Sequence, residues 1–146
     1  MAISLVSQPN VLPIRPLALK RRLNKVLRAL GQDKASLTVL LTHDQEIQDL
    51  NRKFRGKDAP TNVLAFPGGE PFPGSKGTYL GDVAISLETV AREAEAANRP
   101  VGEVFYFYLI HGTLHLLGFD HARGPAEEAA QEKEEARLLA LIPHDL

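Results

Sequence analysis

Three of the five histidines of this chain lie close together, in the stretch from His111 to His121. His111 and His115 are four residues apart, so a helix through them places both imidazoles on one face, one turn apart. Gly118 stands where a helix end favours a left-handed backbone, which lets the chain turn and bring His121 back. Three neutral imidazoles leave the fourth position of a tetrahedral zinc ion open, as in catalytic zinc sites. The sequence therefore predicts one Zn²⁺ per chain on these histidines, with other divalent transition metals as alternative occupants.

The histidine spacing matches the signature of the metzincin proteases, but the residue that performs their proton transfer is absent. Those enzymes have a general-base Glu directly after the first His, where this chain has Gly112. The Met-turn of those proteases is missing as well, because the only methionine is Met1. A peptidase is therefore an alternative that the ligand spacing favours and the missing base opposes. Histidines packed in a helix core without a metal are the plain alternative.

The length and the amino-acid composition are typical of a globular protein with a single domain, here residues 1–146. The chain has no cysteine, which excludes thiolate ligands, disulfides and thiol catalysis. The N-terminus lacks the basic start and apolar stretch of a signal peptide, and no apolar run is long enough to span a membrane. We therefore expect a cytoplasmic protein without membrane contact.

Charge is distributed unevenly along the chain, although the net charge is only −1. Residues 1–73 hold eleven Lys and Arg against six Asp and Glu, whereas residues 74–146 hold six against twelve. A locally basic face in the first half can meet phosphates. The alternative is an ordinary solvated helix surface.

Hydrophobic periodicity and turn residues divide the chain into helices and strands. Short apolar or β-branched runs predict strands at residues 3–7, 36–41, 63–66 and 79–86. Helical spacing predicts helices at residues 17–30, 87–98, 100–117 and 125–141. Another helix begins at a capping box formed by Thr42 and Gln45 and ends before Gly56. Residues 67–77, rich in Gly and Pro, predict a connection.

The elements do not follow a regular strand–helix–strand rhythm, so the predicted fold class is α+β. We expect a small mixed sheet of about four strands, flanked by about five helices. The predicted metal site lies at the end of a central buried helix. The last helix should turn its glutamates to solvent, namely Glu127, Glu128, Glu132, Glu134 and Glu135. His43 and His144 are interpreted as surface histidines.

Three blocks of the sequence resemble the bacterial YbeY family of metal-dependent endoribonucleases and ribosomal RNA maturation factors. The blocks are LNRKFRGKDAPTNVLAFP at residues 50–67, LGDVAIS at residues 80–86 and HGTLHLLGFDH at residues 111–121. Phe54 and Ala65 stand where the family often has Tyr and Ser, and neither departure removes a metal ligand.

The resemblance implies a mixed sheet flanked by helices, and zinc or a similar metal on His111, His115 and His121. It also implies that Arg55 faces the metal and that the substrate is single-stranded RNA, notably the precursor 3′ end of 16S ribosomal RNA. Roles in rRNA processing, ribosome quality control and small-subunit assembly follow from the same resemblance. The implied partners are the small ribosomal subunit, the proteins of its platform and an Era-type GTPase.

Residues near the histidines indicate how such a site would cleave a phosphodiester bond. A three-histidine zinc can supply a hydroxide near neutral pH or bind a phosphate oxygen directly. The planar guanidinium of Arg55 is suited to hold the non-bridging phosphate oxygens. Asp120 is a candidate for orienting a histidine ligand, with direct proton transfer as the alternative. Asp82 is a second candidate for support of the site, or else the cap of a turn at a strand end.

Several points stay open at the level of the sequence. Arg52, Lys53 and Lys57 are candidates for a phosphate-binding track, or serve only the solubility of a loop. The general base is not identified, and the 2′-hydroxyl of RNA is an alternative nucleophile to water. A ribosome-assembly factor with a structural zinc is the non-enzymatic alternative.

Overall fold

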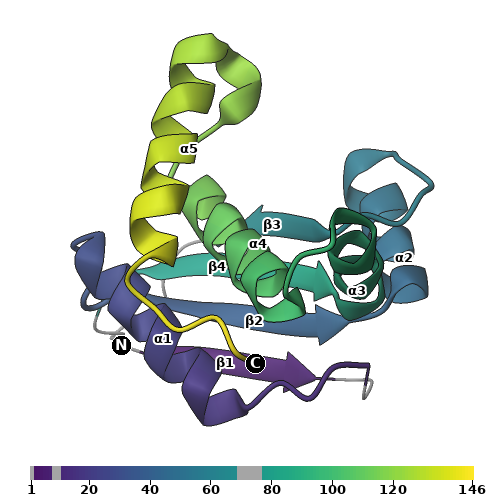
Figure 1. Cartoon of the computed structure of the whole chain (residues 1–146). Coiled ribbons are helices and arrows are strands. Elements are labelled where there is room, and N and C mark those ends of the chain that lie inside the picture. Colours follow the sequence, from purple (N-terminus) through teal and green to yellow (C-terminus); the bar gives the residue numbers. More distant parts are fainter. Residues whose placement is uncertain (1, 8–10, 69–76) are drawn as a thin grey trace.

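The computed structural model describes residues 2–7, 11–68 and 77–146, which form one four-stranded sheet and five α-helices (Figure 1). The strands are β1 (Ala2–Ser7), β2 (Ser36–Thr42), β3 (Val63–Pro67) and β4 (Tyr79–Ser86). The helices are α1 (Pro16–Ala29), α2 (Asp44–Arg55), α3 (Leu87–Ala97), α4 (Val101–Leu116) and α5 (Pro125–Leu139), with a short 3₁₀ turn η1 (His121–Arg123) before α5. The predicted α+β class is confirmed, while most of the 67–77 connection lies outside the described residues.

The sheet is mixed, with the strand order β1-β2-β4-β3. β1, β2 and β4 run parallel, and β3 pairs with β4 in the antiparallel direction. Gly81 pairs with Pro67 at one end of β4 and has a φ of 134°, which only glycine adopts readily. A Cβ atom at Gly81 would lie 2.1 Å from the backbone oxygen of Phe66, so glycine also permits the close approach of the two strands.

The larger core lies between one face of the sheet and the helices α1, α3 and α4, and α5 closes it at one end. Figure 1 shows α1 and α4 across this face. The apolar stripe predicted for the first helix is buried there at Leu19, Leu23, Val26 and Leu27. α2 packs on the opposite face of the sheet. A smaller apolar cluster there consists of Ile47, Leu64 and Ala84. None of the helices in the described residues combines the length and the apolar character that crossing a lipid bilayer requires.

One prediction about local structure is wrong. The cap of α2 is His43 and not Thr42, because Thr42 still pairs with Ser86 in the sheet. The Nδ1 atom of His43 accepts a hydrogen bond from the backbone N–H of Glu46 at 3.4 Å. His144 is half-buried, and its Nε2 lies 2.7 Å from the backbone oxygen of Leu139.

Candidate metal centre

The last two turns of α4 carry His111 and His115, and a Schellman motif ends the helix directly behind them. The backbone N–H of Phe119 bonds to the oxygen of Leu114 at 3.1 Å, and that of Gly118 bonds to His115 at 3.1 Å. Gly118 has a φ of 98°, as predicted for the turn. The chain thus reverses after α4 and returns to it with the 3₁₀ turn η1, which begins at His121.

The three histidines line one cleft of about 480 Å³. The ring centres of His111 and His121 are 5.3 Å apart. Arg55 and Asp120 line the same cleft, so the structure brings five of the predicted site residues together.

The fit of a metal to this cleft rests on the type and position of the donors. Two imidazoles on one tetrahedral zinc ion, each with a Zn–N distance of about 2.0–2.1 Å, have ring centres about 5 Å apart. The separation of His111 and His121 agrees with that value. Among the described residues, however, no three His, Asp or Glu side chains converge into a group that could hold a metal ion. The donors fit a metal in kind and location, but the three rings do not converge on one point.

The electrostatics of the cleft favour a neutral imidazole at His115. Partial desolvation of the His115 ring, which still contacts solvent, lowers its pKa, and the neighbouring His111, His121 and Arg55 lower it further, against the opposing charge of Asp120. A neutral ring has a free lone pair at one nitrogen, which metal binding requires.

Asp120 lies beside the histidines, but its hydrogen bond goes to the backbone. Its Oδ1 accepts from the N–H of Ala122 at 3.0 Å and caps η1. Asp120 therefore holds the turn that carries His121, which is a different contact from the predicted orientation of a histidine ring.

Arg55 reaches the cleft because it is the final residue of α2. Gly56 then adopts a left-handed conformation with a φ of 71°, and Asn51 ties the following loop down through the backbone oxygen of Ala59 at 2.9 Å. The side chain of Arg55 is exposed. In the part of the chain that the structure describes, its guanidinium forms no ion pair. Phe54 precedes it, is 59% exposed and packs edge-on against Phe66 at the rim of the cleft.

The three other basic candidates lie around this end of α2 without lining the cleft. Arg52 is exposed and pairs with Asp49 at 3.3 Å. The Nζ atom of Lys53 lies 5.4 Å from the ring centre of Phe54. Lys57 is exposed in the loop after the helix. They form a basic border next to Arg55.

Asp82 lies apart from the histidines. Its side chain lines a second cavity of about 440 Å³, on the sheet face that α2 covers, and accepts a hydrogen bond from the Tyr79 hydroxyl. The next residue, Val83, points to the opposite face and contacts α4. The structure therefore does not bring Asp82 to the cleft, and its support of the site stays a prediction.

The contact that sequence reasoning missed comes from α5. Glu135 was expected to face solvent, but it is buried, with only 4% of its surface exposed. Its Oε2 lies 2.7 Å from Nδ1 of His111, and the Nε2 atom of Gln131 lies 3.1 Å from the same nitrogen. The signal was present in the sequence, because Gln131, Glu135 and Leu138 follow one another at helical spacing.

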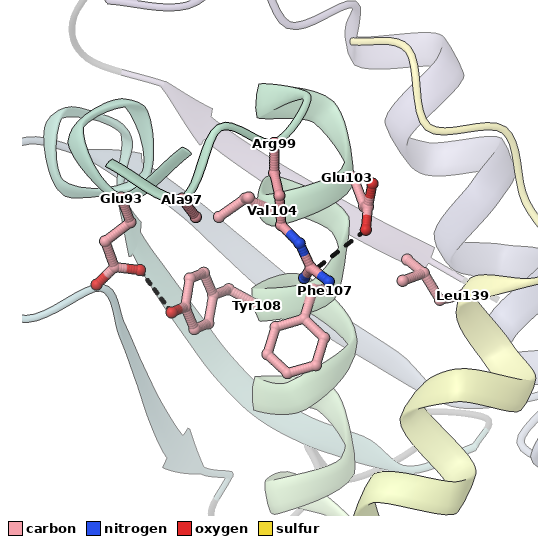
Figure 2. A pocket seen from close by; sticks show the side chains of 8 residues that line it. All are labelled: Glu93, Ala97, Arg99, Glu103, Val104, Phe107, Tyr108 and Leu139. Atoms are coloured by element: carbon pink, nitrogen blue, oxygen red, sulfur yellow. Dashed lines mark hydrogen bonds and ion pairs between the residues drawn. The ribbon is translucent and has the colours of Figure 1, made fainter. Parts of the chain in front are cut away.

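A separate small pocket lies between α3, α4 and the end of α5, as Figure 2 shows. It measures about 190 Å³. The Tyr108 hydroxyl donates to Glu93 at 2.5 Å, and burial raises the pKa of Tyr108 far above its ordinary value, so the phenol stays protonated. Arg99 and Glu103 pair at 3.8 Å on its wall. None of the predicted site residues lines this pocket.

The model of the family described as "Endoribonuclease YbeY" matches residues 10–142 of the chain. The chain belongs to the YbeY family. The match contains every block on which the sequence resemblance rests, including the three histidines.

Several YbeY proteins are similar to the chain. Endoribonuclease YbeY of an Anaeromyxobacter species is 51% identical over 120 residues, which cover 82% of this chain and 61% of that protein. The chain thus spans under two thirds of that relative. Endoribonucleases YbeY of Geobacter sulfurreducens and Syntrophus aciditrophicus are 40% and 36% identical over 97% of the chain, and are themselves covered to 96% and 90%.

A solved structure supports the fold. The solution structure of TM1509 from Thermotoga maritima superposes with a TM-score of 0.66. The superposed region covers 94% of this chain and 86% of that protein. At 24% sequence identity, this match shows a likeness of fold alone.

Proposed function

We propose that this chain is a metal-dependent endoribonuclease that cleaves single-stranded RNA. The observation that carries the proposal is the cleft itself, in which an arginine and three histidines meet in a member of the YbeY family. The names of the similar proteins, each an endoribonuclease YbeY, support phosphodiester hydrolysis over the alternative of a peptidase. Gly112 supports the same choice, because glycine offers no general base after the first histidine.

In this proposal His111, His115 and His121 hold one Zn²⁺ or a similar divalent transition metal. When bound, the metal supplies Lewis acidity, which acidifies water and polarises a phosphoryl oxygen. Arg55 is the catalytic residue of the chain. Its five N–H donors and fixed charge hold the non-bridging oxygens of the scissile phosphate as negative charge grows on them.

The rim of the cleft suits a single strand of RNA. Phe54 exposes an aromatic face on which a base next to the scissile phosphate can stack. The basic border of Arg52, Lys53 and Lys57 supplies positive charge for the neighbouring phosphates. A paired duplex could not offer its bases to Phe54, so this arrangement selects unpaired RNA.

The family resemblance carries the biological part of the proposal. The chain acts in rRNA processing at the 3′ end of 16S rRNA, with further roles in ribosome quality control and small-subunit assembly in the cytoplasm. Its partners are the small ribosomal subunit, the proteins of the platform and an Era-type GTPase.

One paired experiment tests the proposed activity. Metal content of the purified protein is measured alongside cleavage of a single-stranded RNA by the native protein, by the metal-stripped protein and by Arg55→Ala. We expect one equivalent of metal, cleavage lost on stripping and restored by zinc, and cleavage about 10²-fold slower in Arg55→Ala with metal still bound. Cleavage that survives both treatments would identify a contaminating nuclease and refute the proposal.

A further inference from the structure

Glu135 is a buried carboxylate with an unusual environment. It comes from α5, is 4% exposed and forms one ion pair within the described residues, with His111. A buried carboxylate is costly unless a hydrogen-bond donor or an opposite charge compensates it. For Glu135 that donor is the Nδ1 atom of His111, which lies 2.7 Å from Oε2.

The contact with Glu135 determines which nitrogen of His111 carries the proton. A carboxylate accepts, so Nδ1 must donate, which leaves the lone pair of a neutral ring at Nε2. Gln131 agrees with this assignment once its amide is turned. Its Nε2 faces Nδ1 at 3.1 Å, while its buried Oε1 has no hydrogen-bond partner among the described residues. Rotating the amide by a half turn places Oε1 as a second acceptor for the Nδ1 proton.

We propose that Glu135, assisted by Gln131, is a positioning residue that fixes His111 in the tautomer with a free Nε2 lone pair for the metal. The proposal rests on the proposed metal centre. A histidine ligand normally donates its second ring N–H to a carboxylate or carbonyl, which fixes the ring and strengthens the ligand. Glu135 and Gln131 lie one turn apart on α5, so both reach the same nitrogen of α4.

This role makes α5 part of the metal centre. In the part of the chain that the structure describes, no side-chain hydrogen bond holds the ring of His115 or His121. His111 is therefore the one ligand with a fixed ring, and it sets the position that the other two must reach. α5 acts through His111 without contacting the substrate.

Nuclear magnetic resonance of the metal-free protein tests the tautomer directly. Long-range proton–nitrogen correlations on labelled histidine report which ring nitrogen is protonated, and the His111 signals are assigned by their absence in His111→Gln. Three variants are compared with the wild type. Glu135→Met removes the acceptor, Glu135→Gln retains a neutral one, and Glu132→Gln is a matched control because Glu132 is exposed on the same helix. Zinc affinity is measured on the same proteins by competition with a chelator.

We expect the Nδ1–H tautomer of His111 in the wild type, the control and Glu135→Gln, and a mixture in Glu135→Met. Zinc should bind 10–100-fold more weakly to Glu135→Met, with Glu135→Gln between it and the wild type. A wild type with the proton on Nε2 would overturn the role of Glu135. So would a Glu135→Met variant that loses thermal stability but keeps wild-type zinc affinity. A wild type that binds no zinc would overturn the metal centre itself.

Discussion

Gly112 lies where α4 packs tightly against the sheet. A Cβ atom at this position would be 2.8 Å from Cγ1 of Val83 and 3.1 Å from Cγ2 of Val63. Replacing a helical Gly by Ala ordinarily gains up to about 1 kcal/mol of helix stability. Here we expect Gly112→Ala to lower the free energy of unfolding by about 1–3 kcal/mol, because β-branched Val83 is buried and has no room to move. Urea unfolding measures the change, and a more stable Gly112→Ala variant would contradict the close packing.

Arg55 differs from a lysine in geometry as well as in length. Its guanidinium presents a planar fork that matches two phosphate oxygens, whereas an ammonium is a point charge. We expect Arg55→Lys to cleave RNA more slowly than the wild type but faster than Arg55→Ala, with zinc affinity unchanged in both. Arg28→Lys is the matched control, since Arg28 is exposed on α1 and does not line the cleft. Wild-type cleavage by Arg55→Lys would reject the two-oxygen contact and leave only a role for charge.

At the residue scale the sequence predicted that the three histidines lie together, which the cleft confirms, and it wrongly placed Glu135 in solvent, while the metal-binding role of the histidines stays a prediction. The spacing of His111 and His115 has a direct geometric meaning in any helix. The side of α5 that is buried depends instead on how the helix docks. Leu138 marked that side, and its stripe continues back to Glu135 and Gln131, but these polar residues resembled a solvent-facing surface. A buried polar contact is decided by tertiary packing, which hydrophobic periodicity does not report.

At the scale of elements, Asp44 fixes the helix that delivers Arg55. Its Oδ1 accepts hydrogen bonds from the hydroxyls of Ser86 and Thr89, both at 2.6 Å, and Arg92 pairs with its Oδ2 at 2.7 Å. These contacts join the first turn of α2 to the N-terminal half of α3. Burial alone would raise the pKa of Asp44, but the hydrogen bonds from Ser86 and Thr89 and the charge of Arg92 outweigh it and lower the pKa below 3.8.

The lowered pKa of Asp44 fixes the direction of a pH effect. A carboxyl whose pKa is lower in the folded state stabilises the fold above its unfolded pKa, and this stability is lost as pH falls through the folded pKa. We therefore expect Asp44→Asn to unfold about 1–3 kcal/mol more easily than the wild type at neutral pH. The difference should shrink below pH 3.8. Chemical unfolding across pH measures this, with exposed Asp49→Asn as the control on the same helix. A difference that is independent of pH would exclude the charge of Asp44 as the cause.

The elements themselves were predictable because each carries its own local signal. The apolar stripe of α1 and the glycine after α4 indicate the same local structure in any tertiary context. The start of α2 was misplaced by one residue because pairing in the sheet extends β2 to Thr42, a long-range effect. The 3₁₀ turn η1 was missed for a different reason, since three residues are too few to show a period.

At the scale of the whole molecule, the cleft proposed to hold the metal lies at the border of the fold and not in its core. The larger core is built from apolar residues of the sheet, α1, α3, α4 and α5, and it includes none of the three histidines. His115 and His121 are exposed. The fold therefore does not depend on the metal for burial of its apolar surface, in contrast to small domains that are unfolded without zinc.

This arrangement separates an enzyme from an assembly factor with a structural zinc. We expect the metal-stripped protein to unfold cooperatively, and zinc at a hundred times its Kd to add about 2.7 kcal/mol of stability by mass action. His121→Ala should keep the stability of the metal-free protein and lose the zinc-dependent gain, because the ring is exposed and its removal uncovers no buried apolar surface. Thermal unfolding with and without zinc measures both quantities. If stripping or His121→Ala unfolds the chain, the metal stabilises the fold. That result would favour the assembly factor with a structural zinc over the enzyme.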